Sequence, residues 1–337
     1  YPVAIIIVYV FVLYTTFGGM FSIAKSDGFN SFIIIVGVMV AITFILEKTQ
    51  GISAIMAQAK LIEGYAISGI DYYTPKGSLL QPLAGGNMTL LSLVSAFFGW
   101  GLGLAANPQY TVRIIAAKDD QTAKRMIARS IIILAVTYVA LAFIGLGSRV
   151  LMPSVENVDS MDALFPYVFN AQFPSTVSGI ILMAIMAAAI STANSQLLVV
   201  SGSFVYDIYR MMKPEEENDD KLLLLSRVVV FFAGSMALIL AFSPPESLIV
   251  YGGYVWGVFS AVFFLPLYGG IFWPRATRNS AMFSMIAGLL TMLISIFVKW
   301  HAQSIFDVNP ALPSVIVAGV VFWIVAVHEE SDDEVKY

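Results

Sequence analysis

Small and polar residues occupy the middle of one long apolar stretch, TVSGIILMAIMAAAISTANSQLLVVSGSFVYDIYR at 176–210. The stretch carries no charge before Asp207, and its first two-thirds is long enough to cross a bilayer as a helix. Several of its small and hydroxyl residues recur at the helical repeat and so share one face. These are Ala184, Ala188, Ser191 and Ser195, with Thr192 beside them. Lipid offers polar groups no partner, so this face must contact protein or water.

Two interpretations of this face stay open from the spacing. The first is a packing surface, because small residues let helices approach closely and hydroxyls can bond to the carbonyl one turn earlier. The second is a cation site, in which the carbonyl oxygen of Ala188 and the hydroxyls of Ser191 and Thr192 converge within one turn. Neutral oxygens of this kind suit a hard, weakly held ion such as sodium.

The composition places the whole chain in a membrane. Of its 337 residues, 58% are hydrophobic and only 12% are charged, so lipid is the expected surrounding. Nine apolar spans predict an all-α, polytopic membrane protein. They are 2–17, 29–46, 88–106, 128–152, 176–205, 222–242, 247–272, 280–299 and 311–328. The chain opens inside an apolar run without a cleavable signal, so we expect it to be part of a longer one.

The loops between these spans predict the orientation. Lys and Arg residues gather in every second loop, and by the positive-inside bias those loops are cytoplasmic. The acidic end at 329–337 falls on the same side and is predicted to be a cytoplasmic tail. The expectation is a single transmembrane transporter domain over 1–337, multi-pass in the cell membrane.

Several classes of function are disfavoured by what the chain contains. It has no cysteine and two histidines, which excludes thiol chemistry and argues against a histidine-rich metal site. No span carries the paired carboxylates that intramembrane catalysis would need, and none has a channel-filter pattern. The bilayer is therefore the expected partner, and no enzyme activity, no further cofactor and no nucleic acid are expected; a coupling ion and a small solute enter with the family resemblance below.

An acidic residue stands at the start of the second span. The first connection, GGMFSIAKSDGFN at 18–30, places Asp27 at its predicted cytoplasmic end. Two roles stay open for this carboxylate. It could cap the helix N-terminus, or it could lie on an exit route for an ion.

The third span contains residues that weaken helices. Gly99, Gly101 and Gly103 alternate, and Asn107-Pro108 follows. Backbone freed at membrane depth persists only where it lines protein or a wet cavity, so a broken helix of the kind that builds transporter sites is expected. The alternative is a glycine packing surface with an ordinary helix end at Pro108.

Aromatic residues alternate with glycines in the seventh span, YGGYVWGVFSAVFFLPLYGGIFWPR. Tyr251, Tyr254 and Trp256 belong either to an interfacial aromatic belt or to a gate over a solute route. The spacing leaves both open.

Several motifs taken together resemble the sodium:solute symporter family. FGGMFSIAKSDGFN is similar to that family's GG-x7-D element, FGWGLGLAANPQYTVR to its W-G-L-G-x4-P-x4-R helix, and AAAISTANSQLLVVSGSFVYDIYR to its A-x-x-S-T-x3-Q-L-L segment. YVWGVFSAVFF and FWPRATRNSAMFSMIAG resemble its late helix and the loop that follows. The similarity extends over essentially the whole chain.

The resemblance implies a LeuT-type inverted repeat of five plus five helices with extra spans, of which this chain holds the last nine of about thirteen. By motif position it assigns Ala188, Ser191 and Thr192 to the family's sodium site and Asp27 to sodium passage. On the solute helix it implicates a further set, namely Trp100, Gly103, Leu104 and Pro108.

The resemblance also bears on the activity. It implies sodium-coupled symport of a small organic solute that is pantothenate-like, proline-like or another small carboxylate. Leu104 stands where the proline symporters have a tyrosine, and Lys25 and Asn30 depart from the family pattern near the ion route. The alternative function is a membrane-embedded solute sensor on the same fold.

Overall fold

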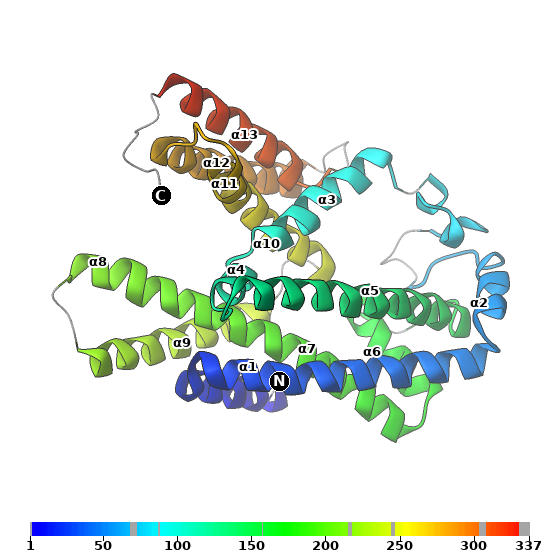
Figure 1. The fold of residues 1–337 in the computed structure, drawn as a ribbon. Helices are drawn as coiled ribbons and strands as arrows, with labels where there is room; N and C mark the ends of the chain where they lie inside the picture. Colours follow the sequence, from blue (N-terminus) through cyan, green and yellow to red (C-terminus); the bar gives the residue numbers. More distant parts are fainter. Residues whose placement is uncertain are drawn as a thin grey trace. The chain divides into compact units, whose positions relative to one another are not determined.

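The computed structural model describes residues 2–67, 73–86, 88–156, 158–214, 218–243, 247–302 and 308–329. Nearly all regular structure in these ranges is helical (Figure 1). The β-structure in the described part consists of two isolated bridges, Gly64 with Thr74 and Ile67 with Val155. The predicted all-α class is therefore confirmed.

The chain divides into two compact units. The first joins Tyr1–Leu80 to Asp119–Pro244, and the second joins Gln81–Lys118 to Pro245–Tyr337. The first unit contains α1 (Pro2–Thr49), α2 (Ile52–Ala59), η1 (Ser78–Leu80), α5 (Asp120–Leu151), α6 (Met161–Gln172), α7 (Ser175–Gly202), η3 (Ser203–Tyr209), α8 (Arg210–Met212) and α9 (Asp219–Ala241). The second contains η2 (Ala84–Gly86), α3 (Leu90–Ala105), α4 (Pro108–Ile115), α10 (Leu248–Phe264), η4 (Leu265–Gly269), α11 (Gly270–Phe272), α12 (Arg278–Ala302) and α13 (Ala311–His328).

Local capping explains where several helices begin. The side chains of Asp119, Ser160 and Asn218 accept backbone N–H bonds at the starts of α5, α6 and α9. Such caps satisfy N–H groups that have no partner inside the helix. The cap at Asp119 starts α5 before the apolar run predicted at 128–152. The short helices α2 and α6 were not predicted, because neither is long or apolar enough to register as a span.

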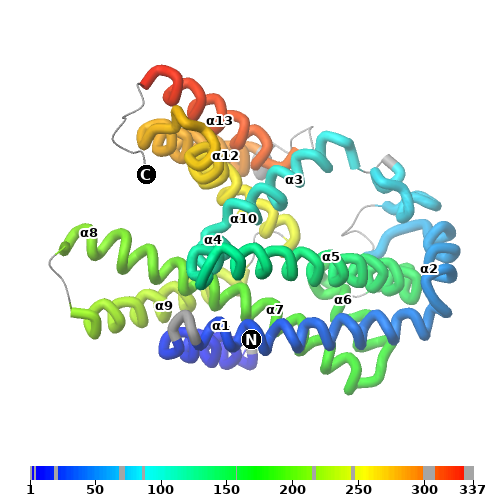
Figure 2. The backbone as a smooth tube through the Cα atoms, in the orientation of Figure 1, coloured from blue at the N-terminus to red at the C-terminus, as the bar shows by residue number. Residues whose placement is uncertain are grey.

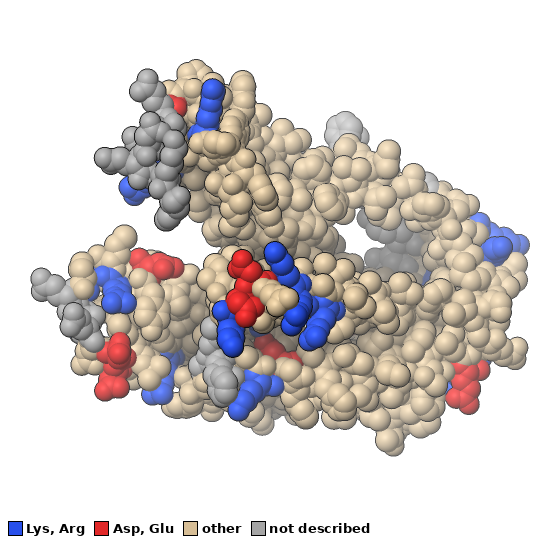
Figure 3. Space-filling model, in the orientation of Figure 1, with Lys and Arg blue, Asp and Glu red and all other residues tan. Residues whose placement is uncertain are grey.

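Eight helices in the described part are long and apolar enough to cross a membrane. They correspond to eight of the nine predicted spans, while the first predicted span appears as a shorter apolar helix, Ile5–Gly18. Charged atoms cover little of the face shown in Figure 3, as expected for a chain surrounded by lipid. The chain is thus a multi-pass membrane protein.

The predicted first connection is not a loop. Helical structure continues through 18–30, so α1 covers both predicted spans in 48 residues. The connection contains three glycines, Gly18, Gly19 and Gly28, and a glycine inside a helix costs only about 1 kcal/mol. The two predicted spans appear as the apolar helices Ile5–Gly18 and Ser22–Thr49, so the connection between them is shorter than predicted.

The first half of α1 runs antiparallel to α9. Tyr9 donates a hydrogen bond to Ser235 at 3.4 Å, while the Arg227 guanidinium lies 5.3 Å from the centre of the Phe17 ring. A later residue of α1 therefore meets an earlier residue of α9. Helices α9 and α7 are themselves antiparallel neighbours, joined near their common end by a bond from Ser201 to the Ser226 carbonyl at 3.2 Å.

The second half of α1 runs antiparallel to α7. A Cβ at Gly37 would overlap Ala184, and Lys48 donates to the carbonyl of Gln172. Since α7 and α9 are antiparallel, the two halves of α1 run in opposite directions. In Figure 2 the blue tube runs toward the left along the first half and back toward the right along the second. The change of direction lies after Phe17. The structure therefore keeps the two predicted spans, 2–17 and 29–46, as two separate segments of α1.

Each unit has its own apolar core. In the first, buried residues of α1, α2, α5, α6 and α7 form one cluster around Ile45, Ile55, Ile144 and Phe169. In the second, Ala261, Met292 and Ala311 join α10, α12 and α13. A Cβ at Gly288 would overlap the Ala261 carbonyl, so α10 and α12 approach to backbone contact.

A carboxylate ties the end of α13 to the start of α12. Thr277 donates to Glu329 at 2.5 Å, and Asn279 donates to its other oxygen at 2.6 Å. These two bonds, that from Thr277 first, hold the pKa of Glu329 below its ordinary value of 4.5. The rest of the tail predicted at 329–337 lies outside the described residues.

We expect acid to weaken the two hydrogen bonds that the Glu329 carboxylate accepts from Thr277 and Asn279. Because the pKa of Glu329 is lower in the folded state, its contribution to stability is present above about pH 4.5 and is lost as pH falls through the folded pKa. The thermal unfolding midpoint should therefore drop with acid by a larger amount in the wild type than in Glu329→Gln. An identical pH dependence in the two proteins would contradict the assignment.

Candidate functional site

The three predicted cation ligands meet in the middle of α7. Ser191 and Thr192 donate their hydroxyl hydrogens to the Ala188 carbonyl at 3.0 and 3.1 Å. Thr192 is exposed, whereas Ser191 and Ala188 are half-buried. Local helical geometry therefore brings three oxygens together, as the spacing predicted. The same bonds are those expected of hydroxyls that merely satisfy their own helix, so the packing interpretation predicts them equally.

A buried amide next to this site was not singled out from the sequence. Asn194 is fully buried, accepts a bond from Thr15 at 2.7 Å and donates to the Tyr14 hydroxyl. It therefore fastens the first half of α1 to α7 one turn beyond Ser191. The only sequence signal was the polarity of Ser-Thr-Ala-Asn-Ser-Gln in an apolar span.

Asp27 lies beside the same face of α7. Ser195 donates to the Asp27 carboxylate at 3.5 Å and to the Ser191 carbonyl at 2.9 Å, and it is almost fully buried. Asp27 is inside α1 and not at a helix start, so the N-cap interpretation was wrong. A line of oxygens thus runs from the Ala188 carbonyl to a carboxylate.

The helix of the third predicted span is broken where Asn107-Pro108 predicted. Helix α3 ends at Ala105, and α4 begins at Pro108 with Asn107 as its cap, whose Oδ1 accepts the Gln109 N–H at 2.9 Å. The Ala105 carbonyl, freed at the break, accepts the Tyr268 hydroxyl at 3.2 Å. The break therefore comes from proline and its cap.

The glycines before this break are packing positions inside a regular helix. At Gly103 a Cβ would overlap the Trp256 carbonyl oxygen and lie 2.7 Å from its carbonyl carbon. At Gly99 a Cβ would lie 2.8 Å from Asn309. Both glycines are buried, so the alternative of a glycine packing surface describes them correctly while the break lies further along.

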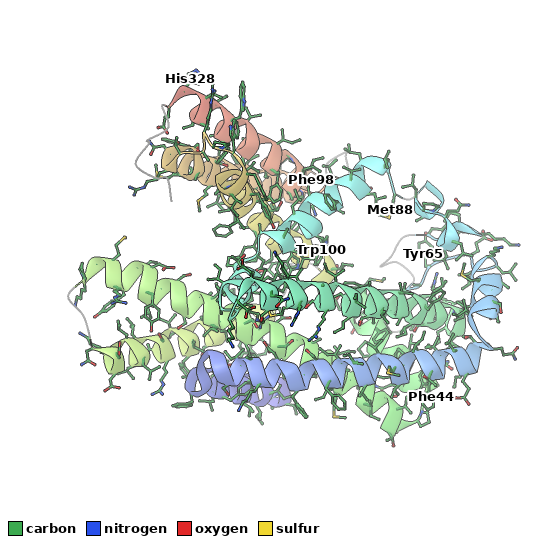
Figure 4. The ribbon with its side chains drawn as sticks, viewed as in Figure 1. Phe44, Tyr65, Met88, Phe98, Trp100 and His328 are labelled. Carbon is green, nitrogen blue, oxygen red and sulfur yellow. The ribbon has the colours of Figure 1, made fainter. Side chains whose placement is uncertain are left out.

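Trp100 lies where α3 meets α10 (Figure 4). Its ring is 6.4 Å from that of Trp256 with the planes 49° apart, and it lies against Gly252 and Gly253. Leu104 is half-buried one turn further along α3, and Pro108 is half-buried at the start of α4. The two tryptophans thus form one contact between the helices.

The three predicted gate residues of α10 do not form one cluster. Tyr251 is exposed, Tyr254 packs against the core of the second unit, and the Trp256 ring is tilted against those of Trp100 and Phe259. A gate made of Tyr251, Tyr254 and Trp256 would therefore need side chains from different faces of α10 to act together.

Acidic and histidine residues do not gather into a metal centre. Within the described ranges there is no group of three or more His, Cys, Asp or Glu side chains that could hold a metal ion. The cation-site residues all belong to the first unit, and the solute-helix residues all belong to the second.

Comparison with known proteins identifies the family. The model of the sodium:solute symporter family matches residues 1–288. Sodium/proline symporters of Staphylococcus aureus, including that of strain JH9, are 25% identical over 332 residues, which is 96% of this chain and 61% of theirs. The chain therefore spans about three-fifths of the length of these curated relatives.

A solved structure of a sodium-coupled sialic acid symporter, in its substrate-bound outward-open state, has the same fold. Its TM-score is 0.74 with 21% sequence identity, over 98% of this chain and 68% of that one. The expected LeuT-type helical architecture is confirmed by this match. These relatives are symporters, which points to transport and gives the sensor alternative no support. On the family model, which covers most of its length, the chain belongs to the sodium:solute symporter family.

Proposed function

We propose that this chain forms most of a sodium-coupled symporter that carries a small organic solute across the cell membrane. The observation that carries the proposal is the match of the sodium:solute symporter family model over residues 1–288. The convergence of the Ser191 and Thr192 hydroxyls on the Ala188 carbonyl supports it, because it places three oxygens within one turn of an apolar span.

The sodium ion would take its oxygens from Ala188, Ser191 and Thr192. The two hydroxyls now donate to the carbonyl, and rotating them would turn three lone-pair oxygens toward one point beside the exposed Thr192. Hard cations take about six oxygen ligands, so water or other residues would complete the shell. Uncharged ligands hold such an ion weakly enough to let it leave.

Asp27 would act in the passage of sodium and not in its binding shell. Ser195 links its carboxylate to the Ser191 carbonyl, so an ion leaving Ser191 would find oxygens at each step. A carboxylate inside a membrane segment is costly and is usually functional. Lys25 lies two residues earlier, and its charge would slow release.

The solute would contact the second unit through Trp100, Gly103, Leu104 and Pro108. The broken helix supports this, because interrupted helices present backbone groups to solutes at membrane depth. The solutes for which these relatives are named, proline and sialic acid, are carboxylates. We infer a small carboxylate, pantothenate-like or proline-like, with Tyr254 and Trp256 as gate residues and Tyr251 at the exposed end.

Coupling would follow from the difference in sodium affinity between outward-open and inward-open states. A ligand shifts a conformational equilibrium only by that difference, and about 1–3 kcal/mol is ordinary. Sodium bound at α7 would favour the outward-open state, and solute binding would then permit the change to the inward-open state.

Uptake into proteoliposomes tests the proposal. We expect the full-length protein to accumulate one of labelled proline, pantothenate or N-acetylneuraminate when an inward sodium gradient is imposed, and not with an equal gradient of choline. Saturable solute binding without any uptake would favour a sensor. Uptake that follows a proton gradient and ignores sodium would overturn the sodium assignment.

A further inference from the structure

Asn309, just before α13, fills the space between α3 and α10. A Cβ at Gly99 would lie 2.8 Å from its Nδ2 atom, and one at Gly253 would lie 3.4 Å from the same atom. A methyl group at Gly99 would therefore crowd the carboxamide, and one at Gly253 would lie in van der Waals contact with it. The side chain therefore occupies a gap that both helices keep open.

One hydrogen bond sets the direction of this carboxamide, because its Oδ1 accepts the Ala311 N–H at 2.9 Å. The backbone N–H of Asn309 donates to the Ser95 hydroxyl at 2.8 Å and fixes the main chain beside it. Ser95 is fully buried, and its hydroxyl donates to the Ser92 carbonyl at 2.8 Å. The oxygen is used at the start of α13, and the amide nitrogen is the carboxamide atom nearest to both glycines.

Trp100 and Asn309 share a neighbour at Gly253. A Cβ there would lie 3.3 Å from the indole Nε1 and 3.4 Å from Nδ2 of Asn309, so the two nitrogens are at most 6.7 Å apart, the sum of these distances. On its other side the indole contacts Gly252, where a Cβ would lie 2.7 Å away. The Asn309 amide thus bounds the space in which the indole sits.

We infer that Asn309 is a positioning residue that holds the Trp100 indole in place and thereby sets solute affinity. This rests on the proposed function, since it takes Trp100 to contact the solute. Without the carboxamide, the gap between Gly99 and Gly253 would let the indole turn away from its present contact with α10. Sodium activation, which depends on α7 in the other unit, should not change.

The test measures the indole directly as well as transport. In full-length protein labelled with 5-fluorotryptophan, the ¹⁹F resonance of Trp100 is assigned by its loss in Trp100→Phe. We expect Asn309→Ala to shift or broaden that resonance and to raise the solute KM about fivefold, the effect of one lost hydrogen-bonding group. The maximal rate and the half-saturating sodium concentration should stay within about twofold. Asn309→Asp keeps the oxygen that caps α13 and fills the same gap, so it should keep the resonance and the KM closer to wild type than Asn309→Ala does.

Ser314→Ala is the matched control. Ser314 is fully buried on α13, and its hydroxyl donates to the Pro310 carbonyl at 2.7 Å, away from Trp100. This variant should leave both the resonance and the KM unchanged. The inference is overturned if the Trp100 resonance is the same in Asn309→Ala as in wild type, or if it shifts while the KM does not. Absence of uptake in every protein would count against the symporter proposal alone, because the resonance still reports on the indole.

Discussion

Replacing both Ser191 and Thr192 by alanine is expected to raise the sodium concentration for half-maximal uptake about a hundredfold. Each hydroxyl lost removes one ion ligand, and a loss of about 1.4 kcal/mol per ligand is a factor of ten. The two hydroxyls converge on one carbonyl, at 3.0 and 3.1 Å, so they would act on the same ion. Each single variant should show about a tenfold rise. The measurement is the sodium dependence of initial uptake in proteoliposomes.

Ser178→Ala controls for the loss of a hydroxyl from α7. Ser178 is buried on the same helix, and its hydroxyl donates to the Phe169 carbonyl at 2.8 Å, far along the chain from Ala188. Its sodium dependence should match that of the wild type, and Thr192→Ser should retain most of the sodium affinity. Unchanged sodium dependence in the double variant would leave the packing interpretation of this face as the correct one.

Gly103→Ala is expected to lower the stability of the second unit by about 3 kcal/mol, the upper end of the range for overpacking a core. Its methyl group would overlap the Trp256 carbonyl oxygen and lie 2.7 Å from the carbonyl carbon. Backbone atoms in the middle of a helix cannot turn aside as a side chain can, so α3 and α10 would have to separate. The thermal unfolding midpoint of the purified protein measures the loss.

Gly101→Ala, two residues earlier on α3, provides the matched comparison. There the added methyl would meet the Phe97 ring at 2.8 Å, and that side chain can rotate. Its midpoint should stay close to that of the wild type. Equal stability of the two variants would show that α3 and α10 do not depend on backbone contact at Gly103.

Measuring both the stability and the uptake of Gly103→Ala also separates a packing role of Gly103 from a role in solute binding. If Gly103 acts only through its contact with Trp256, then Gly103→Ala should lose stability and uptake together. A variant of normal stability and raised solute KM would instead support the role that the family resemblance gives to this glycine.

The sequence by itself determined the features that depend on neighbours along the chain. Apolar runs long enough to cross a bilayer predicted eight of the observed spans, because a helix in lipid must satisfy its own backbone. The spacing of Ala188, Ser191 and Thr192 placed three oxygens within one turn, and Asn107-Pro108 located the break. Each of these depends on residues that are neighbours in one continuous segment: a single apolar run for a span, and about one helical turn for the oxygens and the break.

Only the tertiary structure decided which distant residues meet. Thr15 reaches Asn194 across 179 positions and Asp27 reaches Ser195 across 168, and helical periodicity says which face a residue occupies without naming its partner. The same holds for Asn309, whose role depends on two glycines on different helices. Glycine itself is ambiguous in a sequence, since it can break a helix or let another backbone approach, and the atom that lies opposite decides between them.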